Sequence, residues 1–254
     1  MSKHFKTLTA LFCLLGVLLL LPAGAHCGDA SDVARRAEKC GVSAKTVELV
    51  RARVDAGSVS EAQADGLLSP LLDACVERFP LDPMQDKLAE GLAKHVPALV
   101  ITRALLERLE GYRFARELLL TSTGTLDSEA LVAVAEGVGE GVPRDDFKRY
   151  VSRFANLSPE AFRTGVIMTS LQGQAGFDFG LTSQVVEAGI KNRSLSPQWR
   201  YLVRIILAAR RRGIDDPAIA AAAVAVLEEG GPVSSVMAKL GFTGRNLSGR
   251  TESE

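Results

Sequence analysis

The chain has 254 residues, with 30 basic (Lys and Arg) and 30 acidic (Asp and Glu) residues, and its formal net charge at pH 7 is zero. This balance argues against a nucleic-acid-binding protein and against a protein that binds anionic membrane surfaces, because both classes normally carry a basic surplus. Aromatic residues make up 6% of a chain that is 47% hydrophobic, a composition that favours packed helices over a β-sandwich or barrel.

The first residues have the pattern of an export signal. A positively charged start precedes the apolar run Leu8–Leu21, and small residues follow at Pro22–Ala25, where a signal peptidase would cleave. The run is short for a bilayer span, and no later segment contains the roughly eighteen uninterrupted apolar residues that a span needs. We therefore expect a cleaved signal peptide over residues 1–25 and a periplasmic or secreted protein; a retained N-terminal anchor is the alternative.

Cys27 allows a second interpretation of the same signal. Lipoproteins begin with a lipidated cysteine, but His26 precedes Cys27 where a small residue is expected. Lipidation of Cys27 would leave Cys40 and Cys75 to form a disulfide in an oxidising compartment. A Cys27–Cys40 bridge with Cys75 free and buried is equally compatible with the sequence. Membrane association is expected only if Cys27 is lipidated or the signal peptide is retained.

Short helices and tight turns follow in chain order. The first helix is expected over Asp29–Lys39, and Cys40-Gly41 ends it, because glycine takes the left-handed conformation that closes a helix. Ser43 is placed to cap the next helix, and Val42 and Val47 have the spacing of a hydrophobic staple. One helix therefore ends and another begins within three residues.

The same combination of a glycine at a helix end and a polar residue at the next helix start recurs. Further ends are predicted at Gly57, Glu90-Gly91, Glu136-Gly137, Glu187-Ala188-Gly189 and Gly230-Gly231. Further starts are predicted at Ser60 (with Gln63 as a capping box), Ser158-Pro159, Ser196-Pro197, Asp216-Pro217 and Val233-Ser234. Successive glycines of this set are 34, 46, 52 and 42 residues apart, whereas a homogeneous array keeps a nearly fixed period. We interpret the recurrence as the chemistry of short turns, with degenerate duplication as the alternative.

The segment Asp86–Leu120 is the clearest helical hairpin. Apolar residues recur at helical spacing on both sides of a break at Val96-Pro97. A polar loop is expected at 121–125, and three glycines within Gln172–Gly180 suggest a hinge. These features divide the mature chain into N-terminal helical hairpins over residues 26–120, a C-terminal helical region over 126–242, and a disordered tail over 243–254.

The fold class predicted from these patterns is all-α. We expect nine to eleven short helices in antiparallel hairpins, arranged as an irregular bundle or a short helical stack. The predicted core consists of Leu88, Leu92, Leu105, Leu109, Leu131, Val134, Val151, Phe154, Ile167, Val185, Leu202, Ile206, Val224 and Leu227. Trp199, the one tryptophan, has the helical spacing of a core residue.

Catalytic and metal-binding patterns are scarce. After processing only His26 and His95 remain, and there is no Gly-x-Ser-x-Gly elbow, zinc motif or phosphate-binding loop. We therefore predict no catalytic residue, no cofactor and no metal site. Three carboxylate doublets remain as candidates for a hydrolase. They are Asp145-Asp146, Asp215-Asp216 and Glu228-Glu229.

A run of arginines, Arg210, Arg211 and Arg212, follows the most hydrophobic mature helix. This run is a candidate interaction surface for an acidic partner or membrane, and its alternative role is to stabilise the C-terminus of a core helix. Taken together, the sequence predicts an exported, non-enzymatic helical protein that binds another envelope protein or acts as a scaffold. A helical pocket for an apolar small ligand is the first alternative, and a hydrolase using paired carboxylates is the second.

Overall fold

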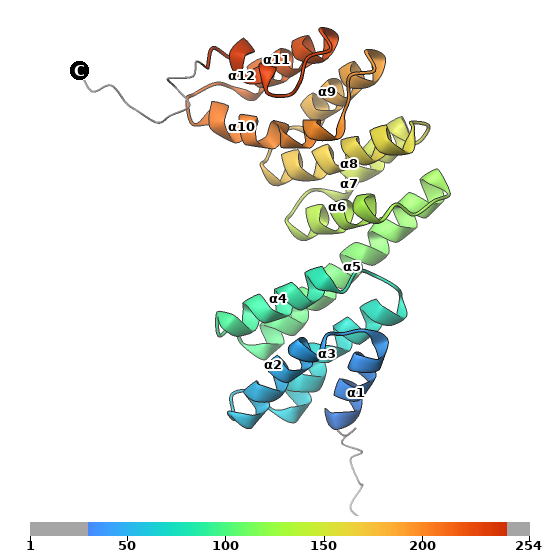
Figure 1. Ribbon diagram of the computed structural model, residues 1–254, viewed down its shortest axis with the longest axis vertical. Helices are drawn as coiled ribbons and strands as arrows, with labels where there is room; N and C mark the ends of the chain where they lie inside the picture. The colour runs from blue at the N-terminus through green and yellow to red at the C-terminus, as the bar shows by residue number, and fades with distance from the viewer. Residues whose placement is uncertain (1–29, 243–254) are drawn as a thin grey trace, which may run out of the picture.

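The structure, a computed structural model, describes residues 30–242 of the chain. Within that range 75% of the structure is helical and no strand is present, which confirms the all-α prediction (Figure 1). Twelve α-helices lie in the described range, eleven of them with seven or more residues. The predicted signal peptide, Cys27 and the C-terminal tail lie outside the described residues.

The helices follow one another with short connections. The first five are α1 (Ala30–Cys40), α2 (Ala44–Asp55), α3 (Glu61–Val76), α4 (Asp82–Ala93) and α5 (Ala98–Thr123). The next four are α6 (Ser128–Gly139), α7 (Arg144–Phe154), α8 (Pro159–Gln174) and α9 (Phe179–Lys191). The last elements are the 3₁₀ helix η1 (Pro197–Tyr201), α10 (Leu202–Arg210), α11 (Asp216–Glu228) and α12 (Ser235–Lys239).

Most of the predicted helix starts are confirmed. The side chains of Ser43, Ser60 and Ser158 each accept a hydrogen bond from a main-chain N–H in the first turn, and Ser60 forms the full capping box with Gln63. Ser196 differs from the prediction, because its side chain makes no cap bond and the chain enters the 3₁₀ turn η1 before α10 begins. The corner at Val96-Pro97 is confirmed as the junction between α4 and α5.

Helix ends share one geometry in ten of the twelve described α-helices. A residue with positive φ follows the helix, and the N–H of the next residue bonds to the carbonyl five positions earlier, as in a Schellman motif. The positive-φ residues are Gly41, Gly57, Arg78, His95, Gly141, Gly176, Arg193, Gly213, Gly230 and Gly241. Three of the ten are not glycine, so the sequence pattern alone could not locate every helix end.

The predicted ends at Gly91, Gly137 and Gly189 are wrong. These glycines lie inside α4, α6 and α9, and the left-handed residue comes four positions later in each case. A Cβ at Gly91 would lie 2.8 Å from Ile101, one at Gly137 would lie 2.6 Å from Ser170, and one at Gly189 would lie 2.9 Å from Leu195. Glycine is therefore needed at these positions for close packing, because a side chain from a later helix or turn occupies the space of the missing side chain.

The helix ends, once correctly placed, reveal a repeat of two helices. Gly41 and Arg78 are 37 residues apart, Gly57 and His95 are 38 apart, and Arg193 and Gly230 are 37 apart. The step from His95 to Gly141 is longer, 46 residues, and it contains the 26-residue helix α5. The chain is therefore a stack of helical hairpins with a period near 37 residues, and the irregular glycine spacings compared positions that are not equivalent.

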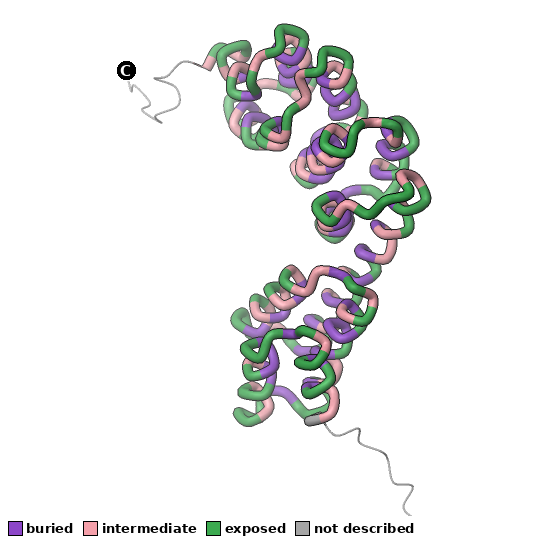
Figure 2. The backbone as a smooth tube through the Cα atoms, turned by 45° about the vertical axis from the view of Figure 1, so that its right-hand side comes forward, coloured by how far each residue is buried: buried purple, intermediate pink, exposed green. Residues whose placement is uncertain are grey.

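The hairpins rise in chain order from one end of the molecule to the other (Figure 1). Helix α1 packs on α3 and α3 on α5, whereas from α5 onward the stack continues through α6, α8 and the η1–α10 segment. Figure 2 shows that the molecule narrows where α5 passes from the lower to the upper part. The predicted loop at 121–125 is partly helical, because α5 extends to Thr123, and one continuous core runs across this division.

The predicted core is buried, with two exceptions. Twelve of the fourteen predicted core residues are buried, and so is Trp199 at 1% exposure. Val224 is half-buried, and Ile167 faces a cleft on the molecular surface. The suggested hinge at 172–180 is an ordinary turn, in which Gly176 has the left-handed conformation and Asp178 caps α9.

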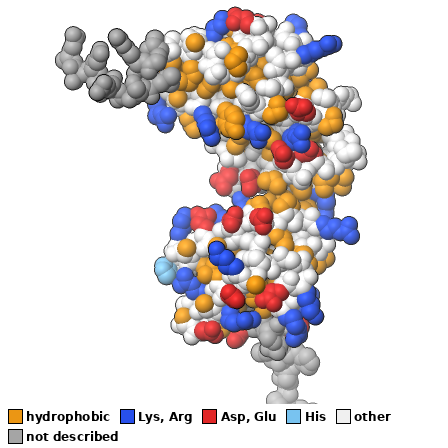
Figure 3. All heavy atoms as spheres, in the orientation of Figure 1, with side chains coloured by type: hydrophobic (Ala, Val, Ile, Leu, Met, Phe, Trp, Pro, Cys, Tyr) orange, Lys and Arg blue, Asp and Glu red, His pale blue; other side chains and the backbone are white. Residues whose placement is uncertain are grey.

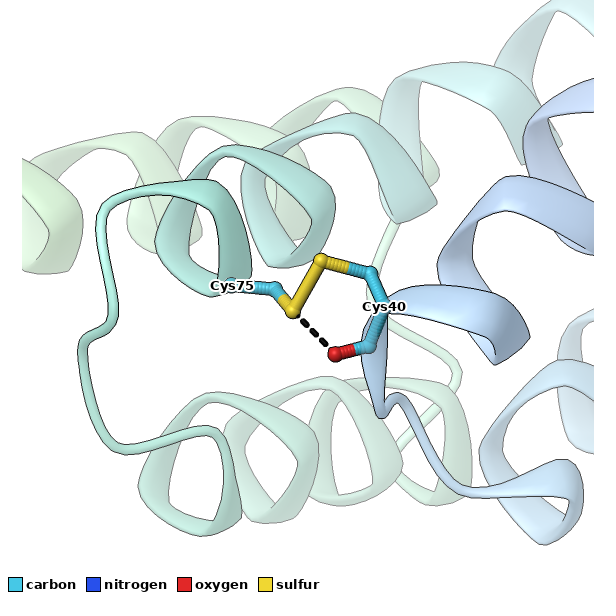
Figure 4. Close-up of a disulfide and its surroundings, with 2 residues drawn as sticks. All are labelled: Cys40 and Cys75. Atoms are coloured by element: carbon cyan, nitrogen blue, oxygen red, sulfur yellow. Dashed lines mark hydrogen bonds between the residues drawn. A yellow bond between two sulfur atoms is a disulfide. The ribbon is translucent and has the colours of Figure 1, made fainter.

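A disulfide joins Cys40 at the end of α1 to Cys75 at the end of α3, with the two Cα atoms 6.0 Å apart. Figure 4 shows the Cys75 sulfur beside the main-chain oxygen of Cys40. This pairing selects one of the two connectivities that the sequence left open, and it fastens the first repeat to the second.

An ion-pair cluster ties the end of α3 to α5. Glu77 accepts hydrogen bonds from Arg113 and Arg116, and the Arg116 guanidinium also lies 4.5 Å from the centre of the Phe79 ring. The hydrogen bond from Arg113 is the main reason that the pKa of Glu77 lies below its ordinary value.

Candidate functional site

A cleft of about 480 Å³ lies between α6 and the η1–α10 segment, over α8. It continues toward the N-terminal end of α8 into a second hollow of about 240 Å³, and Glu129, Ile167 and Arg200 line both. The combined space lies in the size range of ligand-binding and peptide-binding sites. We refer to it as the α8 cleft.

Three parallel helical segments form the α8 cleft. At their N-terminal ends Arg163 of α8 pairs with Asp127, the N-cap residue of α6, at 3.1 Å. At the other end Arg210 of α10 donates hydrogen bonds to the carbonyls of Ala175 and Gly176, which follow α8. These contacts hold α6, α8 and α10 side by side with the same chain direction.

Close packing behind the cleft fixes the position of α8. Gly165 of α8 lies against Tyr150 of α7, and a Cβ at Gly165 would lie 2.2 Å from the Tyr150 hydroxyl. That hydroxyl donates a hydrogen bond of 2.8 Å to the carbonyl of Phe162, and burial raises the pKa of Tyr150. Because Gly165 leaves room for the tyrosine ring, α7 supports α8 from the side opposite the cleft.

The floor of the cleft is apolar and only partly covered. Ile167 and Leu171 on α8 and Val132 and Ala133 on α6 line it, and all four are half-buried. Ile167 and Leu171 are one helical turn apart, so they share a face of α8. An apolar surface that remains open in a cleft is a typical feature of a binding site.

Charged side chains of opposite sign stand on the two walls. Glu129 and Glu136 are on α6, and neither carboxylate has a hydrogen bond or ion pair within the described chain. Burial raises the pKa of Tyr112 to about 12, and the nearby charge of Glu136 adds to this effect. Arg200, on the opposite wall, donates a hydrogen bond to the carbonyl of Pro197 and has no acidic partner among the described residues.

The three arginines predicted as an interaction surface have different environments. Arg210 pairs with Asp216 and bonds the carbonyls after α8, so its guanidinium is used inside the molecule. Arg212 lies over the Phe242 ring at 4.9 Å. Arg211 is exposed at the end of α10. Arg211 and Arg212 are both exposed, and their part in an interaction surface stays a prediction.

Five of the six doublet carboxylates have a structural role, and the sixth, Glu228, is exposed at the end of α11. Asp145 pairs with Lys148, and Asp146 with Arg149, one turn further along α7. Asp215 is the N-cap residue of α11, and Asp216 pairs with Arg210. Glu229 pairs with Lys239. No doublet lines the α8 cleft.

Residues 30–242 contain no group of three His, Cys, Asp or Glu residues placed to hold a metal ion. His95 is exposed at the α4–α5 corner, where it is the left-handed residue of the turn. No helix in the described range is both long and apolar enough to cross a membrane.

Comparisons of the chain with protein-family models, with curated proteins and with solved structures give no match. Sequence reasoning missed the cleft and assigned Ile167 to the core. One signal could have pointed to it: Glu129 and Glu136 are seven residues apart with Val132 and Ala133 between them, which places two charges and two apolar residues on one helical face.

Proposed function

We propose that the protein is a non-enzymatic helical-repeat scaffold of the cell envelope and binds a segment of a partner polypeptide in the α8 cleft. The observation that carries this proposal is the combination of the open floor at Ile167 and Leu171 with the unpaired carboxylates of Glu129 and Glu136. Stacked helical repeats form extended concave surfaces, and repeat proteins use these surfaces for binding.

Packing within the chain leaves the floor and one of the two carboxylates incompletely satisfied. Glu136 is half-buried, so its carboxylate loses part of its hydration without gaining a hydrogen bond, whereas Glu129 is exposed; the open apolar floor keeps contact with water. Some other charges are paired, including Glu77 with two arginines and Asp216 with Arg210, while exposed carboxylates such as Glu107 and Glu117 have no ion pair among the described residues. What distinguishes Glu129 and Glu136 is their place beside an open apolar floor, where a second molecule could supply partners to both.

Two features support location in the envelope. The N-terminal segment has the charge and apolar pattern of an export signal. The Cys40–Cys75 disulfide is of a kind that persists in oxidising compartments and is rare in the cytosol.

Site-specific photo-crosslinking in cells of the source organism tests the proposal. A photoreactive amino acid at Ala133, in the cleft, is compared with one at Ala221, which is exposed on α11 away from it. We expect a protein adduct at position 133 that is absent at 221 and disappears when Ile167→Glu places a charge on the floor. Equal labelling at both positions, or labelling that Ile167→Glu leaves unchanged, would overturn the proposal.

An apolar small ligand is the second candidate, favoured by the volume and lining of the cleft. Native mass spectrometry of the protein purified from its source distinguishes the two. A stoichiometric small molecule that Ile167→Glu removes would support the ligand, and a bare protein mass together with the position-specific adduct would support the polypeptide.

A further inference from the structure

The two walls of the α8 cleft differ in charge where α6 faces η1, and Glu160 and Arg163 of α8 also line the smaller hollow. The acidic ridge consists of Glu129 and Glu136 on α6. The basic ridge, on the η1–α10 segment, consists of Arg200, which lines both hollows, and the exposed Arg204 beside it, which lies outside the lining; their guanidinium groups lie 5.8 and 4.8 Å from the centre of the same Tyr201 ring. Figure 3 shows Lys and Arg side chains in a row over α10, and Asp and Glu side chains at the level of α6. The apolar floor separates the two ridges.

The space between the ridges is one helix wide. Packed helices are about 8–10 Å apart between axes, so α6 and α10, on either side of α8, are separated by roughly twice that distance. An α-helix with its side chains is about 10–12 Å in diameter, so a helix resting on α8 would contact both ridges. Because α6, α8 and α10 run parallel, a partner helix can lie lengthwise along α8 between them.

The backbone of the cleft also favours a helix over an extended segment. The main-chain groups of α6 and α8 bond within their own helices, and no strand edge exists in the described range. An extended peptide on Ile167 and Leu171 would turn its own N–H and C=O groups toward an apolar surface without partners. A helix satisfies those groups internally and presents only side chains.

Resting on the proposed function, we infer that the occupant is an amphipathic helix of a partner protein with an apolar stripe, a basic flank and an acidic flank. Its apolar stripe packs on Ile167 and Leu171. Its basic flank pairs with Glu129 and Glu136, which are seven residues and therefore about 10.5 Å apart along α6. Basic residues at positions i and i+7 of the partner match this distance, and its acidic flank pairs with the basic ridge.

Synthetic helices test this inference on the purified chain. The bipolar peptide has one leucine stripe, lysines along one flank and glutamates along the other. The control peptide has the same composition, with lysine and glutamate alternating along both flanks. We expect the bipolar peptide to bind about tenfold more tightly in calorimetric titration at low salt, and we expect high salt to reduce the difference, since exposed ion pairs are screened.

Charge reversal of the ridges provides the matched variants. Glu129→Lys with Glu136→Lys makes both walls basic, and this variant should lose the bipolar peptide and prefer one with glutamate on both flanks. Adding Arg200→Glu and Arg204→Glu reverses both walls and should restore the bipolar peptide, docked in the opposite direction. Because two of these outcomes are gains of binding, misfolding of a variant cannot produce them.

The remaining outcomes separate the two proposals. Equal binding of both peptides, lost with Ile167→Glu, would overturn the bipolar helix and leave the polypeptide site standing. If neither peptide binds and the adduct at position 133 still forms, the partner is not a helix of this kind. That result would overturn this inference and leave the polypeptide site standing. Self-association in sedimentation that reversal of the acidic ridge abolishes would identify a second copy of this chain as the occupant and overturn the inference.

Discussion

Removal of the Cys40–Cys75 disulfide is the perturbation whose cost follows most directly from the structure. The bridge closes a loop across 35 positions of the sequence that contains α2 and most of α3. Replacing both cysteines with alanine frees this loop in the unfolded chain. The loop-closure relation then gives a loss of about 4 kcal/mol in the free energy of unfolding at 25 °C.

The architecture predicts where that loss is felt. In a stack of repeats each unit contacts its neighbours, so the N-terminal repeats should open without the rest of the molecule. We expect hydrogen exchange followed by mass spectrometry to show faster exchange in α1, α2 and α3 and unchanged exchange in α9 and α11, which pack on each other. Chemical reduction of the wild-type protein should give the same pattern. Uniform loss of protection, or a stability change under about 0.5 kcal/mol, would refute the reasoning.

Three further predictions follow from packing and charge. Gly165→Ala forces a methyl group against Tyr150 and should cost about 1–3 kcal/mol in urea unfolding, whereas Gly139→Ala, with nothing within 4 Å, should be neutral or stabilising by up to about 1 kcal/mol. Arg210→Ala removes an ion pair and two carbonyl partners and should cost about 1–3 kcal/mol, and an unchanged urea midpoint would contradict its internal role. The pKa of Glu77 is lower in the folded protein than its ordinary value of 4.5, so the ionised side chain stabilises the fold when the pH is above 4.5. This contribution to the free energy of unfolding is lost as the pH falls through the lowered pKa. Glu77→Gln should therefore weaken the acid dependence of unfolding between about pH 7 and about pH 3, and an identical dependence in both proteins would exclude that pair as its source.

Local chemistry made the helices predictable. Ser43, Ser60 and Ser158 cap helices as expected because a cap bond involves residues within one turn of each other. The Val96-Pro97 corner is predictable for the same reason, since proline restricts the residue before it and cannot continue the preceding helix.

Errors arose where a residue's role depended on its packing against another helix or turn. Gly91, Gly137 and Gly189 have the same local signature as a helix-closing glycine, and only the helix or turn packed against each shows that it is a close-contact position. His95 and Arg193 close helices without being glycine; histidine is enriched at positive φ, but neither residue type marks a helix end by itself. These errors concealed the repeat period, because the spacings were measured between unlike positions.

Two residues at or near the candidate site also have roles that depend on how the helices pack. Ile167 has the helical spacing of a core residue, and it faces the cleft because α6 and η1 pack beside α8 without covering it. Arg210 looks like part of an exposed run, and it points inward because the end of α8 offers it two carbonyls.

The amino-acid sequence by itself determined the helical class, most of the helix starts and the apolar faces, because each depends on groups a few residues apart along one chain. Tertiary structure decided which cysteines form the disulfide and which glycines are close-contact positions instead of helix ends. It also decided how one acidic and one basic wall face each other across α8. Those outcomes depend on contacts between different helices or turns, several of them more than thirty residues apart, whose geometry exists only once the hairpins have packed.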